Sequence, residues 1–250
     1  MSKVVITGIN GGIGQALAQE FLRKGLRVVG VDLGKSGPEG LEYYQLDVTD
    51  EPKALATYKE IHETHPDIVY WCNNAGLAVL GPFLEVSTAD FNKVMAVNLT
   101  AVITATRFWL EIFNRKGGCV INMASAAGII PSGDMSSYVA SKHAVIGFTR
   151  AVQLELEAQK SFASTCLVVP GFVQTGIMQV GSKYGLPEKI KGIASTPEDC
   201  AKEIVAGVMK GEREIIPTLS GKVMTGLYRF LPFGHELAKT VYQQSRKMKG

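Results

Sequence analysis

The amino-acid sequence predicts an α/β fold, a doubly wound parallel sheet of about seven strands with helices on both faces. Short apolar runs alternate with stretches in which apolar residues recur every three or four positions, and this alternation continues nearly to the end of the chain. The 250 residues, 46% of them hydrophobic, can bury one sizeable core, which excludes an intrinsically disordered chain. We therefore expect one folded unit over residues 1–220 and an extension of it over residues 221–250.

Seven short apolar runs predict the strands. They cover residues 3–7, 27–32, 43–47, 68–72, 119–123, 164–169 and 214–217. Runs that are apolar at nearly every position, rather than at alternate ones, are typical of parallel strands buried on both faces. Helical periodicity fills the intervals and predicts helices over residues 12–24, 51–64, 88–114, 135–158 and 197–210. No repeat or linker divides the chain, so a single core is expected.

The end of the chain is more basic than the rest. The formal net charge is +3, too small for a general nucleic-acid binder, yet residues 221–250 hold six Lys or Arg and one Glu. Apolar residues recur there at helical spacing on both sides of Pro232, which predicts two short amphipathic helices. Two roles stay open for this extension: it covers the substrate cleft or forms the seam of a homodimer, or it touches an anionic membrane surface.

The cysteines indicate no metal site. Cys72, Cys119, Cys166 and Cys200 are far apart, with no C-x-x-C pair and no Cys/His cluster at ligand spacing. Free thiols are typical of a reducing compartment, and the sequence contains neither a signal-peptide pattern nor an apolar run of roughly 20 residues. We therefore expect a cytoplasmic protein. His62 and His65 fall at a polar helix end and are expected to be solvated.

A glycine-rich loop follows the first predicted strand and opens the first predicted helix. It reads Thr7-Gly8-Ile9-Asn10-Gly11-Gly12-Ile13-Gly14. Glycines let backbone N–H groups approach a pyrophosphate, and the dipole at the helix N-terminus favours the negative charge. The loop therefore predicts a dinucleotide site in a Rossmann-type sheet.

The second strand ends at an acidic residue, Asp32, 18 residues after Gly14. A carboxylate there would accept hydrogen bonds from both hydroxyls of the adenosine ribose and would repel a 2′-phosphate. Asn10, Gly11 and Leu33 supply no cation for such a phosphate. The sequence therefore favours NAD over NADP.

Three further residues indicate a catalytic site. Tyr138 and Lys142 are four residues apart in a helical stretch, which places both on one helix face, although this spacing also occurs by chance. Ser125 gives the pair its context, because it follows the fifth predicted strand and parallel sheets bind ligands at the carboxyl ends of their strands.

Taken together, the motifs resemble the short-chain dehydrogenase/reductase family over residues 1 to about 176. The matching segments are, in order, Thr7-Gly8-x-x-x-Gly12-Ile13-Gly14, Asp47-Val48, Asn73-Asn74-Ala75-Gly76, Asn98, Ser125, Tyr138-x-x-x-Lys142 and Pro170-Gly171-x-Val173-x-Thr175. Their joint occurrence in this order is highly specific. The resemblance implies hydride transfer between a nicotinamide cofactor and an alcohol or carbonyl carbon.

The resemblance also implies catalytic roles for four residues. Tyr138 is expected to act as general base, or as general acid in the reduction, with its pKa lowered by the Lys142 ammonium. Ser125 would hydrogen-bond the substrate oxygen, and Lys142 would also hold the nicotinamide ribose. Asn98 would anchor a water molecule that relays protons to the solvent.

A larger set is implied to bind the cofactor. It consists of Gly8, Asn10, Gly12, Ile13, Gly14, Asp32, Leu33, Asp47, Val48, Asn74, Ala75, Gly76, Tyr138, Lys142, Pro170, Gly171, Val173 and Thr175. Asp47 and Val48 would contact the adenine, and the Asn74 segment would line the ribose side. Val173 and Thr175 would pair with the carboxamide, while Asn73 is expected to be structural.

The substrate is expected to be a small apolar alcohol or ketone. The residues near the catalytic positions are almost uncharged: Ala126, Ile129, Ile130, Pro131, Met135, Phe172, Ile177 and Met178. Glycines between Thr175 and residue 192 favour a mobile lid over residues 178–192. The alternative is a catalytically idle dinucleotide-binding protein with a regulatory or scaffolding role, which would have no chemical need for all four catalytic residues.

Overall fold

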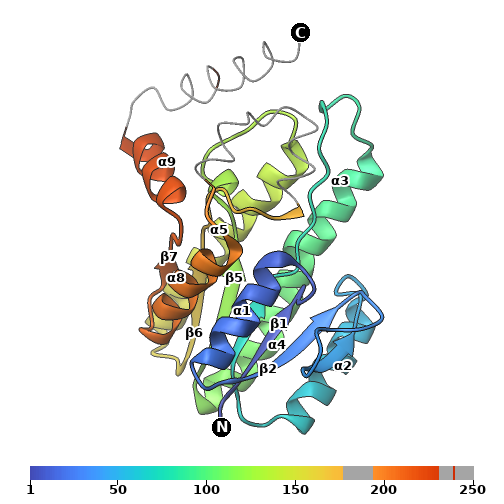
Figure 1. Ribbon diagram of the computed structural model, residues 1–250, viewed down its shortest axis with the longest axis vertical. Coiled ribbons are helices and arrows are strands. Elements are labelled where there is room, and N and C mark those ends of the chain that lie inside the picture. Colours follow the sequence, from blue (N-terminus) through green and yellow to red (C-terminus); the bar gives the residue numbers. More distant parts are fainter. Residues whose placement is uncertain (177–193, 231–238, 240–250) are drawn as a thin grey trace.

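A seven-stranded parallel sheet runs through the computed structural model, which describes residues 1–176, 194–230 and 239 (Figure 1). The strands are β1 (Lys3–Thr7), β2 (Arg27–Asp32), β3 (Glu42–Gln45), β4 (Ile68–Asn73), β5 (Gly118–Met123), β6 (Ala163–Val168) and β7 (Glu214–Ile215). Their order across the sheet is β3-β2-β1-β4-β5-β6-β7, so the direction of winding reverses between β1 and β4. The predicted fold class is confirmed.

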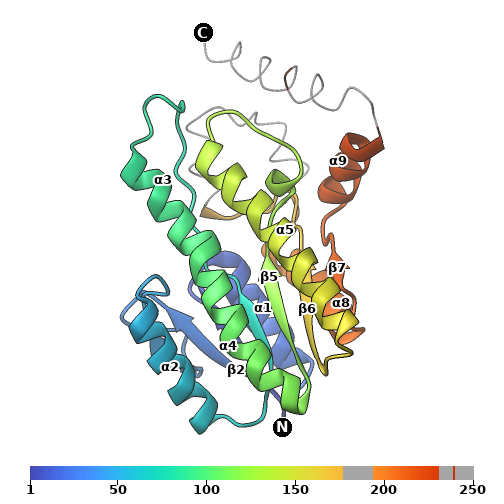
Figure 2. The same ribbon diagram turned by 180° about the vertical axis from the view of Figure 1, so that it is seen from behind.

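Helices cover both faces of the sheet. Helices α1 (Gly12–Arg23) and α8 (Pro197–Met209) lie on one face (Figure 1). Helices α2 (Glu51–Thr64), α4 (Ala101–Lys116) and α5 (Ser136–Ala158) lie on the other (Figure 2). Successive residues of a strand point to opposite faces, so Val4 and Ile6 join the core beneath α1 and α8, whereas Val5 joins the core beneath α2 and α4. None of the described helices is long and apolar enough to cross a membrane.

Three elements differ from the sequence-based prediction by more than one residue at an end. The helix predicted over residues 88–114 consists of α3 (Thr88–Met95), a π-helical turn η1 (Ala96–Thr100) and α4, a break that the continuous apolar period conceals. Strand β3 ends at Gln45, before Asp47. Strand β7 ends at Ile215, and Pro217 two residues later has no N–H to donate to a ladder.

The C-terminal extension begins with helix α9 (Leu219–Phe230), which leaves the end of β7 (Figure 1). This helix confirms the first of the two predicted amphipathic segments. The predicted lid over residues 178–192 and the second predicted helix, apart from residue 239, lie outside the described residues.

A buried polar cluster holds the amino end of β1. Lys3 and His65 are only 7% and 3% exposed, so the expectation that His65 is solvated is wrong. Lys3 Nζ donates to His65 Nδ1 at 2.8 Å, and His65 Nε2 lies 3.0 Å from Glu42 Oε2. Because Nδ1 faces an ammonium donor, the neutral ring carries its proton on Nε2 and donates it to Glu42. Burial lowers the pKa of His65, although the Glu42 carboxylate opposes this.

This cluster makes the folding free energy depend on pH. The pKa of His65 is lower folded than unfolded, so its contribution is complete above the unfolded value of about 6.5 and is lost as the pH falls through the folded value. We expect urea unfolding to show a larger loss of stability between about pH 7.5 and 5.5 for the wild type than for His65→Gln. The glutamine amide can accept from Lys3 and donate to Glu42 but does not titrate. Equal losses in the two proteins would contradict this assignment.

Candidate active site

The glycine-rich turn between β1 and α1 packs directly against the segment that follows β4. Gly8 has φ +67°, and a Cβ on it would lie 2.7 Å from the Cα of Ala75. A Cβ on Gly14 would lie 2.3 Å from the carbonyl oxygen of Gly8. Asn74 Nδ2 donates to the carbonyls of Thr7 and Gly8 at 2.9 and 3.1 Å. Only glycine fits at both positions, and Asn74 is placed to hold the turn.

The N-terminus of α1 is open to an anion. Gly11 precedes the helix, provides no side-chain cap, and no acidic residue lies in the first turn. By contrast, Asp50, Ser87 and Thr196 cap α2, α3 and α8. The first backbone N–H groups of a helix need acceptors from outside it. The start of α1 therefore fits an anion such as a pyrophosphate.

Two further predicted residues lie close to this turn. A Cβ on Gly12 would lie 3.8 Å from Thr175 Cγ2, so the loop after β6 borders the glycine turn. Ile13 packs against the core, which anchors the start of the helix.

Asp32 lies at the end of β2, beside the glycine turn. Its Oδ2 accepts from the N–H of Asn10 at 3.0 Å and its Oδ1 from the N–H of Gly34 at 3.2 Å. These two bonds orient the carboxylate while leaving each oxygen a lone pair for a further donor. Leu33 is 65% exposed. Lys35, also exposed, is a nearby cation that the sequence analysis did not consider.

A small pocket lies where the winding of the sheet reverses. Its lining consists of Thr7, Val48, Asn73, Ala75, Val97, Ala101 and Val102. It therefore brings together Val48 and Ala75, two of the residues expected near the adenosine. Asp47 lies in the turn before Val48, where Oδ1 accepts from the backbone and hydroxyl of Thr49 at 2.9 and 2.7 Å. These bonds lower the pKa of Asp47 and keep it an acceptor.

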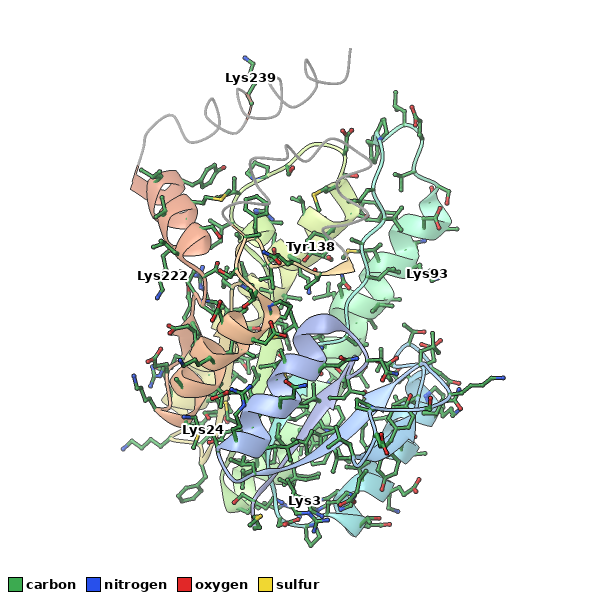
Figure 3. The ribbon with its side chains drawn as sticks, viewed as in Figure 1. Lys3, Lys24, Lys93, Tyr138, Lys222 and Lys239 are labelled. Carbon is green, nitrogen blue, oxygen red and sulfur yellow. The ribbon has the colours of Figure 1, made fainter. Side chains whose placement is uncertain are left out.

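The catalytic candidates converge at the carboxyl end of β5. Ser125 follows the strand, and Tyr138 and Lys142, which are 8% and 4% exposed, lie on the first turns of α5. Tyr138 is labelled in Figure 3. The side chain of Ser125 lies close enough to Tyr138 to affect the pKa of its hydroxyl. Lys142 Nζ lies 5.7 Å from the centroid of the Tyr138 ring. It also donates to the carbonyl of Met123 at 2.8 Å, a contact that no motif indicates.

Burial sets the pKa values of this pair. It raises the pKa of Tyr138, and the hydrogen bond with Ser125 opposes the rise. It lowers the pKa of Lys142 to about 8. The expected lowering of the Tyr138 pKa is therefore not produced by this chain alone. The reason is that burial disfavours both the Tyr138 phenolate and the Lys142 ammonium, and the ammonium is directed at the Met123 carbonyl.

Asn98 is buried in the π-helical turn and joins two other segments. Its Oδ1 accepts from the N–H of Leu77, and its Nδ2 donates to the carbonyl of Leu77, both at 2.8 Å. Nδ2 also lies 3.0 Å from Ser141 Oγ on α5. A Cβ on Gly76 would lie 3.6 Å from Asn98 Oδ1 and 3.8 Å from Lys142 Nζ. Asn98 thus lies beside the catalytic pair, with its amide bound to protein groups.

The loop after β6 completes the site. The carbonyl of Pro170 accepts a hydrogen bond of 2.7 Å from the N–H of Ala126, the residue after Ser125. Gly171 N donates to Thr218 Oγ1 at 2.9 Å, another contact that sequence reasoning missed. A threonine just before a helical stretch is an N-cap signal that would have drawn attention to Thr218. Val173 is buried and pairs with Ser195, which positions Thr175.

The cysteines and acids of the described chain form no metal site. No group of three or more His, Cys, Asp or Glu residues in this part of the chain could hold a metal ion. The four cysteines are free, and burial raises the pKa of Cys119 to about 11.

Comparisons with known proteins identify the family of this chain. The model of the short chain dehydrogenase family matches residues 2–183. The NAD(+) 15-hydroxyprostaglandin dehydrogenase of Macaca fascicularis is 30% identical over 192 residues, which cover 70% of this chain and 69% of that protein.

Two solved structures share the fold. A short chain dehydrogenase/reductase from Burkholderia phymatum in complex with NAD has a TM-score of 0.78 and 23% identity, covering 91% of this chain and 92% of its own. A short chain dehydrogenase from Burkholderia cenocepacia in complex with NADP has a TM-score of 0.80 and 20% identity, covering 96% of this chain and 97% of its own. Since the family model covers most of the chain and the fold agrees with it, this protein belongs to the short-chain dehydrogenase family of oxidoreductases, which act on CH–OH groups.

Proposed function

We propose that this enzyme interconverts an apolar secondary alcohol and its ketone, with NAD(H) as cofactor and Tyr138 as general acid/base. The observation that carries the proposal is the convergence of Ser125, Tyr138 and Lys142 in a buried site at the carboxyl edge of the sheet. The open start of α1 borders the same edge and suits the cofactor pyrophosphate.

The residues of the chain account for the proton transfer. The nicotinamide, when bound, accepts or donates the hydride. An alcohol oxygen must lose its proton as the carbonyl forms, and Tyr138 Oη takes that proton in oxidation or supplies it in reduction. Ser125 Oγ, which lies near Tyr138, is placed to hydrogen-bond the substrate oxygen. Lys142, with a pKa of about 8, holds a positive charge near the phenol at neutral pH.

The proposed substrate class rests on apolar side chains near the catalytic residues. Ile129, Ile130, Met135 and Phe172 are only partly buried and border Ser125, Tyr138 and the Gly171 loop in the sequence. The relative from Macaca fascicularis is named for a hydroxyprostaglandin and NAD(+), which agrees with an apolar hydroxyl substrate.

The preference for NAD rests on Asp32. Its carboxylate is oriented by backbone N–H groups of Asn10 and Gly34 and would face the adenosine ribose. A 2′-phosphate at that position would meet a negative charge, whereas ribose hydroxyls would meet an acceptor.

We further propose that the enzyme acts in the cytoplasm on small molecules and binds no nucleic acid, as its four free thiols and small net charge favour. The exposed apolar residues of α9, Leu219, Val223 and Leu227, are compatible with a homodimer seam. Cosedimentation with anionic vesicles at low salt would instead support the membrane role of the extension.

The catalytic assignment is tested with Tyr138→Phe. Consumption of NADH over a panel of ketones and aldehydes first identifies a substrate, and no consumption by the wild type would favour the idle regulatory alternative. We expect Tyr138→Phe to bind NADH normally and to lose at least about 100-fold in kcat, because only the ionisable hydroxyl is removed. The matched control is Tyr70→Phe, which removes a hydroxyl from a half-buried ring packed near Phe21 and should keep full kcat. More than a few per cent of kcat in Tyr138→Phe would refute the role of Tyr138.

The cofactor assignment is tested by titration. We expect the wild type to bind NADH at least about tenfold more tightly than NADPH, which corresponds to about 1.4 kcal/mol. Asp32→Ala combined with Leu33→Arg should shift the preference toward NADPH, because a repelling carboxylate is replaced by a phosphate-binding cation. Lys35→Ala serves as control and should leave NADH affinity unchanged. Equal wild-type affinities for the two cofactors would contradict the role of Asp32.

A further inference from the structure

Thr218 joins the C-terminal helix to the loop that carries the Pro170-Gly171 motif. It lies between β7 and α9 and is 1% exposed. Its Oγ1 accepts from the N–H of Gly221 at 3.0 Å, and its carbonyl accepts from the N–H of Lys222 at 2.9 Å, so it caps α9. The same Oγ1 accepts from the N–H of Gly171 at 2.9 Å. The Thr218 hydroxyl oxygen therefore accepts hydrogen bonds from both α9 and the Pro170-Gly171 loop.

The two backbones meet so closely that no side chain fits between them. A Cβ on Gly171 would lie 2.5 Å from the N of Gly221 and 2.7 Å from Thr218 Oγ1. A Cβ on Gly221 would lie 2.7 Å from the same Oγ1 and 3.0 Å from the N of Gly171. Both glycines are needed because of this contact, and the contact depends on the threonine oxygen that accepts from both.

The other side of this loop faces the catalytic site. The Pro170 carbonyl accepts from Ala126, the residue after Ser125, at 2.7 Å. Farther along the loop, Thr175 lies beside the glycine turn, because a Cβ added to Gly12 would lie 3.8 Å from Thr175 Cγ2. Gly171 thus lies between the catalytic serine segment and the residues that face the glycine turn. A shift of Gly171 would move both.

We propose that Thr218 is a positioning residue that couples α9 to the nicotinamide end of the cofactor site. The inference rests on the proposed function, in which the loop from Pro170 to Thr175 holds the nicotinamide. Thr218 acts through the backbone of Gly171, and its hydrogen bonds within the described part of the chain do not reach the adenosine-side residues Asp32 and Asp47. Its loss should therefore weaken interactions with the nicotinamide half of the cofactor and spare those with the adenosine half.

The test compares two ligands that differ in the nicotinamide. NADH contains it, whereas ADP-ribose lacks it and keeps the adenosine, pyrophosphate and second ribose. We expect Thr218→Val to raise the Kd of NADH about tenfold, the scale of the buried Gly171 N–H left without its acceptor, and to leave the Kd of ADP-ribose within about twofold. Thr218→Ser, which keeps Oγ, should restore NADH binding. Unchanged NADH binding, or equal weakening of both ligands, would overturn the proposal.

The control is a second buried threonine, which lies within α9. Thr225 is also 1% exposed, and its Oγ1 donates to the Gly221 carbonyl at 2.7 Å, within α9. Thr225→Val makes the same change in shape without touching the loop, so the affinities for both ligands should stay at wild-type values. A selective loss of NADH affinity in Thr225→Val would show that any disturbance of α9 has this effect and would overturn the role of Thr218.

A measurement on the wild type keeps the proposal testable if Thr218→Val does not fold. Because coupling is reciprocal, ordering the loop with NADH should order the start of α9. We expect NADH, but not ADP-ribose, to slow amide hydrogen exchange in residues 219–222. Exchange that both ligands slow equally, or that neither slows, would overturn the coupling. Failure of the wild type to bind NADH at all would instead refute the proposed function.

Discussion

The site depends on the close contact between the β1–α1 turn and the segment after β4. Thr7 Oγ1 accepts from the N–H groups of Asn74 and Ala75 at 3.1 and 3.0 Å, and a Cβ on Gly8 would collide with Ala75. Strands β1 and β4 lie on either side of the point where the winding of the sheet reverses. Because the segments that follow these two strands are in contact, the open start of α1 lies at the edge of the sheet where β4 and β5 end.

A second constraint is the burial of polar groups beneath the catalytic helix. Asn73 Nδ2 donates to Asn122 Oδ1 at 2.8 Å, and Asn122 Nδ2 donates to Thr149 Oγ1 at 3.1 Å, which links β4, β5 and α5. This agrees with the expected structural role of Asn73. Buried amides are costly unless they are paired, so the network favours one alignment of α5 on the sheet. Tyr138 and Lys142 depend on that alignment for their position near Ser125.

The two ends of the sheet serve different purposes. At the carboxyl edge, the carboxylate of Asp32 keeps lone pairs for a ligand, and the first N–H groups of α1 have no side-chain cap. At the amino edge, Lys3, Glu42 and His65 bind one another, and that cluster holds strand ends together. Helix α9 departs from β7 at the catalytic edge and meets the Gly171 loop through Thr218. The described start of the C-terminal extension is thus connected to a loop at the carboxyl edge of the sheet.

The seven strands and the glycine turn could be predicted from the amino-acid sequence, because apolar period and glycine requirements are local properties of the chain. Motif order likewise singled out Ser125, Tyr138 and Lys142, whose catalytic roles stay a prediction. The π-helical turn around Asn98 could not be predicted, since an extra residue in one turn leaves the apolar pattern almost unchanged. The environment of His65, the Met123 carbonyl beside Lys142, and the contact between Thr218 and Gly171 became evident in the folded chain alone. Those contacts join residues from separate elements. The pKa of Tyr138 likewise follows from the side chains that bury it, and their distance from it in space cannot be read from their spacing in the chain.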